Sequence, residues 1–61
     1  MAELQPLVLV VDDALPIRVL LRAGLAKAGY KVLEAADGRQ GLEQFIAQRP
    51  DLVLMDVNMP E

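Results

Sequence analysis

Three short runs of residues suited to β-strands alternate with two longer stretches whose apolar residues recur at helical spacing. The first and third runs, Leu7–Val11 and Leu52–Met55, are apolar at every position, which is typical of parallel strands covered on both faces. The second run, Lys31–Ala35, is more polar and therefore suits the edge of a sheet. The pattern predicts the order strand, helix, strand, helix, strand.

The first predicted helix covers residues 15–28. Pro16 suits its first turn, where a backbone N–H is not needed, and Gly29 is a typical residue to end it. We interpret Arg18 and Arg22, four residues apart, as part of the solvated face. The apolar face, on which the glycine is expected to allow close packing, contains Ile17, Leu20, Leu21, Gly24, Leu25 and Ala28.

The second predicted helix covers residues 38–48. Asp37 precedes it and is a candidate N-cap, and Pro50 follows it and prevents its continuation. Its expected buried face, where the glycine again suits close packing, contains Gly41, Leu42, Phe45 and Ile46.

Alternating strands and helices predict an α/β fold with parallel strands joined by right-handed crossovers. If the two most apolar strands are neighbours, the spatial order is 2-1-3. Right-handed crossovers then place one helix on each face of the sheet. The chain reverses its direction of travel across the sheet between strands 1 and 3, and open α/β sheets bind ligands at such a switch point, at the carboxyl ends of the strands.

Composition excludes several kinds of site and partner. The chain has no Cys, His, Ser or Thr, so it cannot form a disulfide, a thiolate zinc site or a Ser/His/Asp triad. Its net charge of −3 argues against nucleic acid or an anionic membrane as a partner. No apolar run could span a membrane, and the N-terminus lacks the basic region of a signal peptide. We therefore expect a cytoplasmic protein.

A chain of 61 residues is short for a single hydrophobic core. Area scaling predicts that folding buries roughly 5,800 Å², and the apolar share, taken as ~60%, contributes about 87 kcal/mol. Ordering the chain costs about 90 kcal/mol. Because the two terms cancel, we expect an isolated monomer to be only marginally stable.

Three carboxylates follow the two most apolar strands. Asp12 and Asp13 come directly after the first, and Asp56 comes directly after the third. Adjacent parallel strands lie about 4.8 Å apart, so we expect these acids to lie close together. Their mutual repulsion would be relieved by a hard divalent cation such as Mg²⁺, which takes oxygen ligands. The alternative interpretation is that all three are ordinary solvated turn residues.

Several segments, taken in order and at their spacing, resemble a response regulator receiver domain. They are Val10-Val11-Asp12-Asp13, Pro16-Ile17-Arg18, Ala28-Gly29-Tyr30, Ala36-Asp37-Gly38 with Gly41-Leu42, and Pro50-Asp51-Leu52-Val53-Leu54-Met55-Asp56-Val57-Asn58-Met59-Pro60. Any one segment is a weak signal, whereas the acidic pair together with the D-x-x-M-P ending is a strong one. The resemblance covers essentially the whole chain and implies a flavodoxin-like, doubly wound fold.

The resemblance implies a role for each acidic position. Asp56 matches the aspartate that accepts a phosphoryl group from a sensor histidine kinase, and Asp13 and Asp56 match ligands of Mg²⁺. Asp12 matches an acid that helps to hold the ion, often through water, and Asn58 matches a position whose backbone carbonyl completes the site. The resemblance thus implies a signalling module rather than an enzyme.

The family has five strands, and these 61 residues contain counterparts of three. A hydroxyl residue that ends the fourth strand of the family and a lysine that ends its fifth have no counterpart here. We therefore expect residues 1–61 to be a partial receiver domain that is poorly competent for phosphorylation alone. We also expect it to form a homo-oligomer through the edge of its third strand, or to pair with a complementary C-terminal half.

Two other functions deserve comparison with this one. The chain could be a self-associating structural module with no signalling activity. It could instead resemble haloacid-dehalogenase-like phosphatases, which also use an aspartate after a strand. That family needs D-x-D followed by Thr, and Asp12-Asp13-Ala14 has neither feature.

Overall fold

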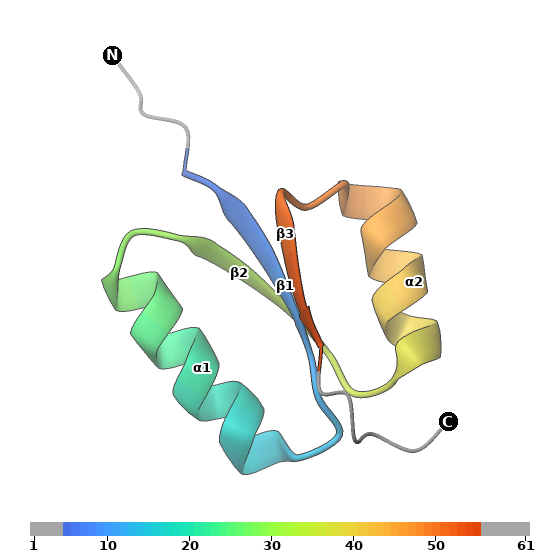
Figure 1. The fold of residues 1–61 in the computed structure, drawn as a ribbon, viewed down its shortest axis with the longest axis horizontal. Helices are drawn as coiled ribbons and strands as arrows, with labels where there is room; N and C mark the ends of the chain where they lie inside the picture. The colour runs from blue at the N-terminus through green and yellow to red at the C-terminus, as the bar shows by residue number, and fades with distance from the viewer. Residues whose placement is uncertain (1–4, 56–61) are drawn as a thin grey trace.

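Strand β1, Leu7–Val11, is the centre of a three-stranded sheet flanked by two helices (Figure 1). The structure is a computed structural model that describes residues 5–55. Along the chain, β1 is followed by α1 (Leu15–Lys27), β2 (Lys31–Ala35), α2 (Gly38–Gln48) and β3 (Leu52–Met55). The predicted order of elements is confirmed. In this part of the chain no helix has the length and apolarity that crossing a membrane requires.

The sheet has the predicted strand order, β2-β1-β3, and both pairings are parallel. Val11 at the end of β1 is level with Ala35 of β2 and Met55 of β3. The carboxyl ends of the strands therefore meet at one edge of the sheet. The polar β2 is an edge strand, as its sequence predicts.

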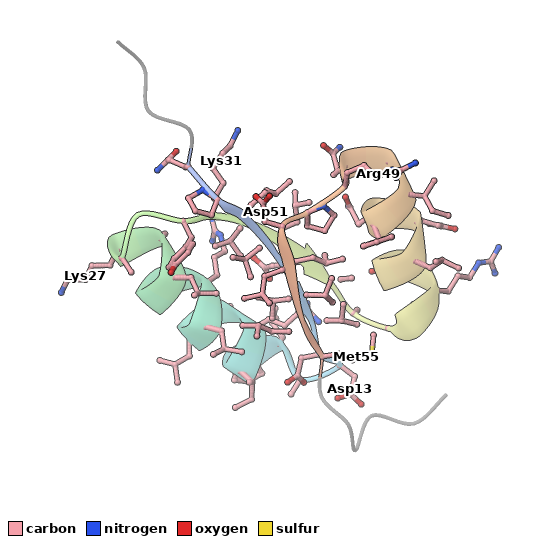
Figure 2. The ribbon with its side chains drawn as sticks, turned by 45° about the horizontal axis from the view of Figure 1, so that its top comes forward. Asp13, Lys27, Lys31, Arg49, Asp51 and Met55 are labelled. Carbon is pink, nitrogen blue, oxygen red and sulfur yellow. The ribbon has the colours of Figure 1, made fainter. Side chains whose placement is uncertain are left out.

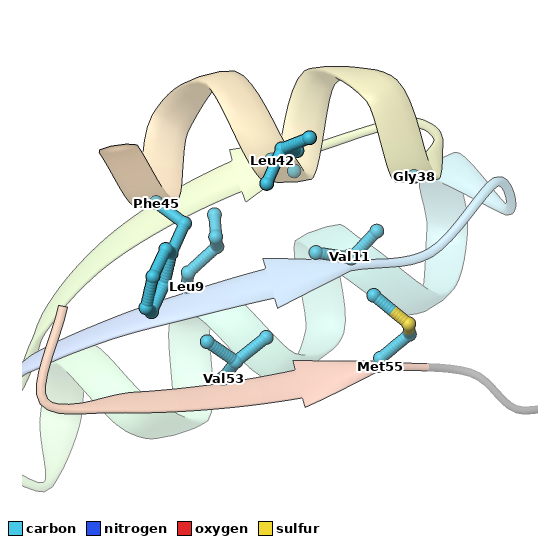
Figure 3. A pocket seen from close by; sticks show the side chains of 8 residues that line it. Leu9, Val11, Gly38, Leu42, Phe45, Val53 and Met55 are labelled. Carbon is cyan, nitrogen blue, oxygen red and sulfur yellow. The ribbon is translucent and has the colours of Figure 1, made fainter. Parts of the chain in front are cut away.

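The helices lie on opposite faces of the sheet, α1 over β1 and β2 on one side and α2 on the other (Figures 1 and 3). Covered on both sides, β1 supplies most of the core: Val8, Leu9, Val10 and Val11 are at most 1% exposed. Its unbroken apolarity thus predicts its central position correctly. The expected truncated doubly wound fold, with a helix on each face, is confirmed.

The predicted apolar face of α1 is largely solvent-exposed in the structure. Leu20 is 69% exposed, and Ile17 and Leu21 are exposed as well. The partly buried side chains of this helix are Arg18 and Leu25, seven residues apart. The prediction of a buried apolar face is therefore wrong for most of its members. The physical reason is that α1 is rotated on β1 and β2, so that only one edge of its apolar face, the line through Arg18 and Leu25, faces the sheet.

The predicted buried face of α2 is also mostly exposed. Gly41 is buried, whereas Leu42, Phe45 and Ile46 are all exposed. Leu42 and Phe45 line an apolar groove of about 310 Å³ between α2 and the sheet (Figure 3). We call this the α2–β3 groove; it is lined by Leu9, Val11, Gly38, Gly41, Leu42, Phe45, Val53 and Met55. The groove is open because nothing among residues 5–55 lies over β3 on this face.

The predicted start of α2 is confirmed by its hydrogen bonds. The Asp37 carboxylate accepts from the backbone N–H of Gln40 at 2.8 Å. In return, the Gln40 side chain accepts from the backbone N–H of Ala36 at 3.0 Å. This reciprocal arrangement is a capping box in which the donor of the return bond is Ala36, one residue before the N-cap Asp37, and it fixes the turn between β2 and α2.

The two helical glycines have different surroundings. A Cβ built on Gly41 would lie 2.9 Å from Cγ2 and 3.3 Å from Cγ1 of the buried Val11, whereas a Cβ on Gly24 would meet nothing within 4 Å. Close packing is therefore confirmed for Gly41. It is wrong for Gly24, because that residue lies on the part of α1 that faces away from the sheet.

We expect Gly41→Ala to lower the free energy of unfolding by about 1–3 kcal/mol, since the new methyl overlaps Val11. The matched Gly24→Ala should raise it by about 0.5–1 kcal/mol, because alanine reduces the entropy cost of the helix and meets no neighbour. Urea unfolding of both variants at one protein concentration measures the difference. Shifts of the same sign would contradict the packing described here.

Candidate functional site

The candidate site lies at the edge of the sheet where the strands end. Asp13 and Met55 are found together at this edge, whereas Lys31 and Asp51 lie at the opposite end of the strands (Figure 2). Asp51 has a structural role there, because its carboxylate accepts from the backbone N–H of Leu7 at 2.7 Å. Only the acids at the carboxyl edge are therefore candidates for binding a ligand at the switch point.

Asp12 is buried, with 7% of its surface exposed. Its backbone N–H continues the sheet by donating to the carbonyl of Ala35 at 3.0 Å. Its side-chain Oδ1 accepts from the backbone N–H of Ala14 at 2.9 Å, which closes a turn two residues long. The Asp12 carboxylate is consequently held in one orientation at the end of β1.

Asp13 follows Asp12 and is exposed to solvent. An exposed carboxylate beside a buried one gives the edge a pair of oxygen-donor groups with different access to water. Within residues 5–55 there is no cluster of three acidic side chains that could hold a metal ion. Asp12 and Asp13 therefore make up the described part of the predicted acidic site.

Asp56 and Asn58, the other predicted site residues, lie outside the described residues. The described chain reaches Met55, which directly precedes Asp56 in the sequence and is level with Val11 in the sheet. Val11 in turn directly precedes Asp12. Carboxylate oxygens next to an open edge are the donor set that a hard cation such as Mg²⁺ takes, so the residues present fit this ion.

Arg18 is a neighbour of the site that the sequence interpretation missed. Its side chain is 15% exposed, so assigning it to the solvated face of the helix is wrong. Its Nη1 donates to the backbone carbonyl of Asp12 at 2.8 Å, and its Nε lies 3.3 Å from Oε1 of Glu34 on β2. Its spacing of seven residues from Leu25 was the available signal, because both occupy the line of α1 that faces the sheet.

Arg22 also contacts Glu34, at 3.4 Å between Nε and Oε2, but 61% of its side chain is exposed. The solvated interpretation is appropriate for this residue. The two arginines differ in that Arg18 reaches the end of β1 whereas Arg22 is one turn farther along the helix.

Comparison with known proteins gives a consistent result. A sequence model of the response regulator receiver domain matches residues 8–61. The chain is 47% identical over 55 residues to the chemotaxis protein CheY of Thermotoga maritima, covering 88% of this chain and 46% of that protein. It is 45% identical over 53 residues to sporulation initiation phosphotransferase F of Bacillus subtilis, covering 87% of this chain and 43% of that protein.

A solved structure shows the same arrangement of elements. The chemotaxis response regulator CheY4 of Vibrio cholerae superimposes with a TM-score of 0.89 at 44% identity, over 93% of this chain and 48% of that one. The present chain therefore spans about half the length of these relatives.

Proposed function

Because the chain belongs to the response regulator receiver domain family, we propose that it supplies the acidic part of a phosphoryl-accepting site in a two-component system. Receiver domains are signalling modules of two-component systems; they interact with sensor kinases and generally bind Mg²⁺. Residues 1–61 would form the first part of such a domain, with its first three strands and two helices.

One observation carries the proposal more than any other. Val11 and Met55 are level in adjacent parallel strands, and each directly precedes an aspartate in the sequence. Asp12 and Asp13 follow the end of β1 at the switch point, and Asp56 directly follows Met55, the last residue of β3, in the sequence. This is the arrangement that a cluster of carboxylates around one cation requires.

Each acidic residue has a distinct proposed role. Asp56 is the phosphoryl acceptor and, together with Asp13, a ligand of Mg²⁺. Asp12 supports the ion through water, which agrees with its Oδ1 being engaged by the backbone N–H of Ala14. The backbone carbonyl of Asn58 completes the set.

The proposed chemistry is phosphoryl transfer by positioning and charge neutralisation. An oxygen of the Asp56 carboxylate attacks phosphorus, the bond from phosphorus to the donor's nitrogen or oxygen breaks, and an acyl phosphate forms. A bound Mg²⁺ would supply positive charge that offsets repulsion between the carboxylates and the anionic phosphoryl group. The buried Asp12 and the exposed Asp13 set where that charge is held.

We expect weak Mg²⁺ binding at this edge of the sheet. A titration with Mg²⁺ should shift the amide NMR signals of Asp13 and Asp56. Asp13→Asn should weaken binding at least about tenfold by removing one ligand charge. Glu43→Gln is the matched control, because it removes the same charge from the exposed surface of α2, where Glu43 lies 3.6 Å from Arg39.

Wild-type protein that is folded and shows no shift at Asp13 and Asp56 would refute the metal site. Equal loss of affinity in Asp13→Asn and Glu43→Gln would show that the ion is attracted by net charge rather than bound at the carboxyl edge.

A second candidate function, a self-associating module without signalling, is favoured by the apolar α2–β3 groove and by the outer edge of β3, which has no neighbouring strand within residues 5–55. The two candidates differ in competence for phosphorylation, which a small phosphodonor tests directly.

A further inference from the structure

Arg18 joins α1, β1 and β2 at a single point beside the acidic pair. Its Nη1 donates to the backbone carbonyl of Asp12 at 2.8 Å, while its Nε donates to Oε1 of Glu34 at 3.3 Å. The guanidinium is largely buried, and the Glu34 side chain is 28% exposed. A planar fork of donors suits this task, because it can hold two acceptors in a fixed relative geometry.

The carbonyl that Arg18 holds belongs to the peptide group linking Asp12 to Asp13. Fixing this oxygen fixes the plane of the peptide and hence the direction in which Asp13 leaves the end of β1. Asp12 is further held by its N–H bond to Ala35 and by its side-chain bond from Ala14. The bond from Arg18 holds the peptide group before Asp13, and the bond from Ala14 holds the peptide group after it.

We propose that Arg18 is a positioning residue for the acidic site, and that Glu34 orients it. By holding the Asp12 carbonyl, Arg18 sets the orientation of the Asp13 carboxylate toward a divalent cation. The identity of the cation rests on the proposed function, whereas the restraint on the β1–α1 turn does not.

An electrostatic role and a positioning role for Arg18 predict opposite effects of its removal on Mg²⁺ affinity. A guanidinium close to two carboxylates repels a cation, so removing a purely electrostatic Arg18 would tighten Mg²⁺ binding. Glu34 offsets much of this charge. If Arg18 acts by positioning, its removal instead weakens binding, as loss of a residue that orients a metal ligand usually does, by about 10–100-fold.

The test compares Arg18→Met with Arg22→Met in the 61-residue chain. Both substitutions remove one arginine from Glu34, but only Arg18 contacts Asp12. We expect the Mg²⁺ dissociation constant, measured from the amide shift of Asp13, to rise about tenfold or more in Arg18→Met. In Arg22→Met it should change by less than about twofold, since that pair is exposed. Unchanged or tighter binding in Arg18→Met would overturn the proposal.

A second measurement needs no metal. Hydrogen exchange of the Ala14 amide reports the Asp12 turn, and in metal-free protein it should accelerate about tenfold in Arg18→Met and stay unchanged in Arg22→Met. Arg18→Lys keeps the charge without the fork, and we expect its Ala14 exchange to be intermediate; it also replaces Arg18→Met if that variant does not fold. Equal exchange in all variants would overturn the positioning role even if wild type binds no Mg²⁺. Accelerated exchange without Mg²⁺ binding would instead refute only the proposed metal site.

Discussion

At micromolar concentration the 61-residue chain will sediment as a dimer or a higher oligomer. β3 is hydrogen-bonded to β1 on one side, and no other strand within residues 5–55 lies on its second side. Leu52 and Met55 are 51% and 54% exposed. An exposed apolar edge strand without lysine, proline or a bulge is a template for pairing with another chain. In a symmetric dimer, two β3 strands would pair antiparallel about the twofold axis.

The apolar surface beside this edge adds a driving force. The α2–β3 groove is open beside this edge, and Leu42 and Phe45, which line it, are exposed. Burying one leucine side chain contributes about 1.5–3 kcal/mol. Since the stability of the isolated monomer is expected to be near zero, a few such side chains decide between monomer and oligomer.

Leu52→Lys tests the edge directly. The substitution places a charge on β3, and it removes from each copy a leucine that the oligomer would bury. The dissociation constant of the oligomer should therefore rise at least about tenfold. Leu20→Lys is the matched control, since it makes the same substitution on the exposed surface of α1. Leu52 is preferable to Val53 as a target because Val53 packs against the core.

Sedimentation velocity over a range of concentrations gives the measurement. A wild-type monomer that melts sharply, with no dependence on concentration, would contradict the prediction. A larger effect of Leu20→Lys than of Leu52→Lys on the dissociation constant would show that the interface lies on α1 and not on β3.

Phosphorylation of the isolated chain will be slow, although it carries the proposed acceptor Asp56. The hydroxyl residue and the lysine that end strands 4 and 5 in the family have no counterpart among its 61 residues. Loss of one group that stabilises developing charge typically costs about 10²–10³ in rate. We therefore expect at least that deficit relative to a complete receiver.

Acetyl phosphate and intact-mass spectrometry measure this rate. The control is Asp56→Asn, which should accept no phosphoryl group at this position. Stoichiometric modification of Asp56 in the isolated chain would show that the acidic edge alone is sufficient for the chemistry.

Local sequence patterns predict the sheet well because its strands have distinct environments. The uninterrupted apolarity of β1 reflects burial on both faces, and the Lys and Glu residues of β2 reflect its edge position. The composition of β3 is that of an interior strand, but its outer edge is open in the described structure. Its sequence therefore indicates a neighbour that residues 5–55 do not provide.

The rotation of the helices on the sheet was less predictable. Hydrophobic periodicity locates an apolar stripe, but it does not say how much sheet is available beneath it. Arg18 shows the consequence: its side chain is largely buried and its guanidinium binds Glu34 and the Asp12 carbonyl, while Leu20 faces solvent. Gly24 was misassigned for the same reason, whereas Gly41 was correctly assigned because α2 does approach Val11.

Of the acidic site, the sequence predicts which acids follow the ends of neighbouring strands. Strand order brings Asp12 and Asp13 to the switch point, and the sequence alone identifies them. The bond from Ala14 is a local turn of the kind that aspartate favours after a strand. The restraint from Arg18 depends on how α1 is rotated on β1, and the spacing of Arg18 from Leu25 is its one signal in the sequence.

The most direct test of the central claim, that this chain carries the acidic half of a phosphoryl-accepting site, is phosphorylation of a completed domain. A chimera would join residues 1–61 to the part of Thermotoga maritima CheY that follows the matched segment, and its fold would be checked by a cooperative melt. Acetyl phosphate with Mg²⁺ should then place one phosphoryl group on Asp56, and Asp13→Asn or chelation of Mg²⁺ should abolish it. A folded chimera that takes up no phosphoryl group, or takes it up independently of Asp13 and Mg²⁺, would contradict the account.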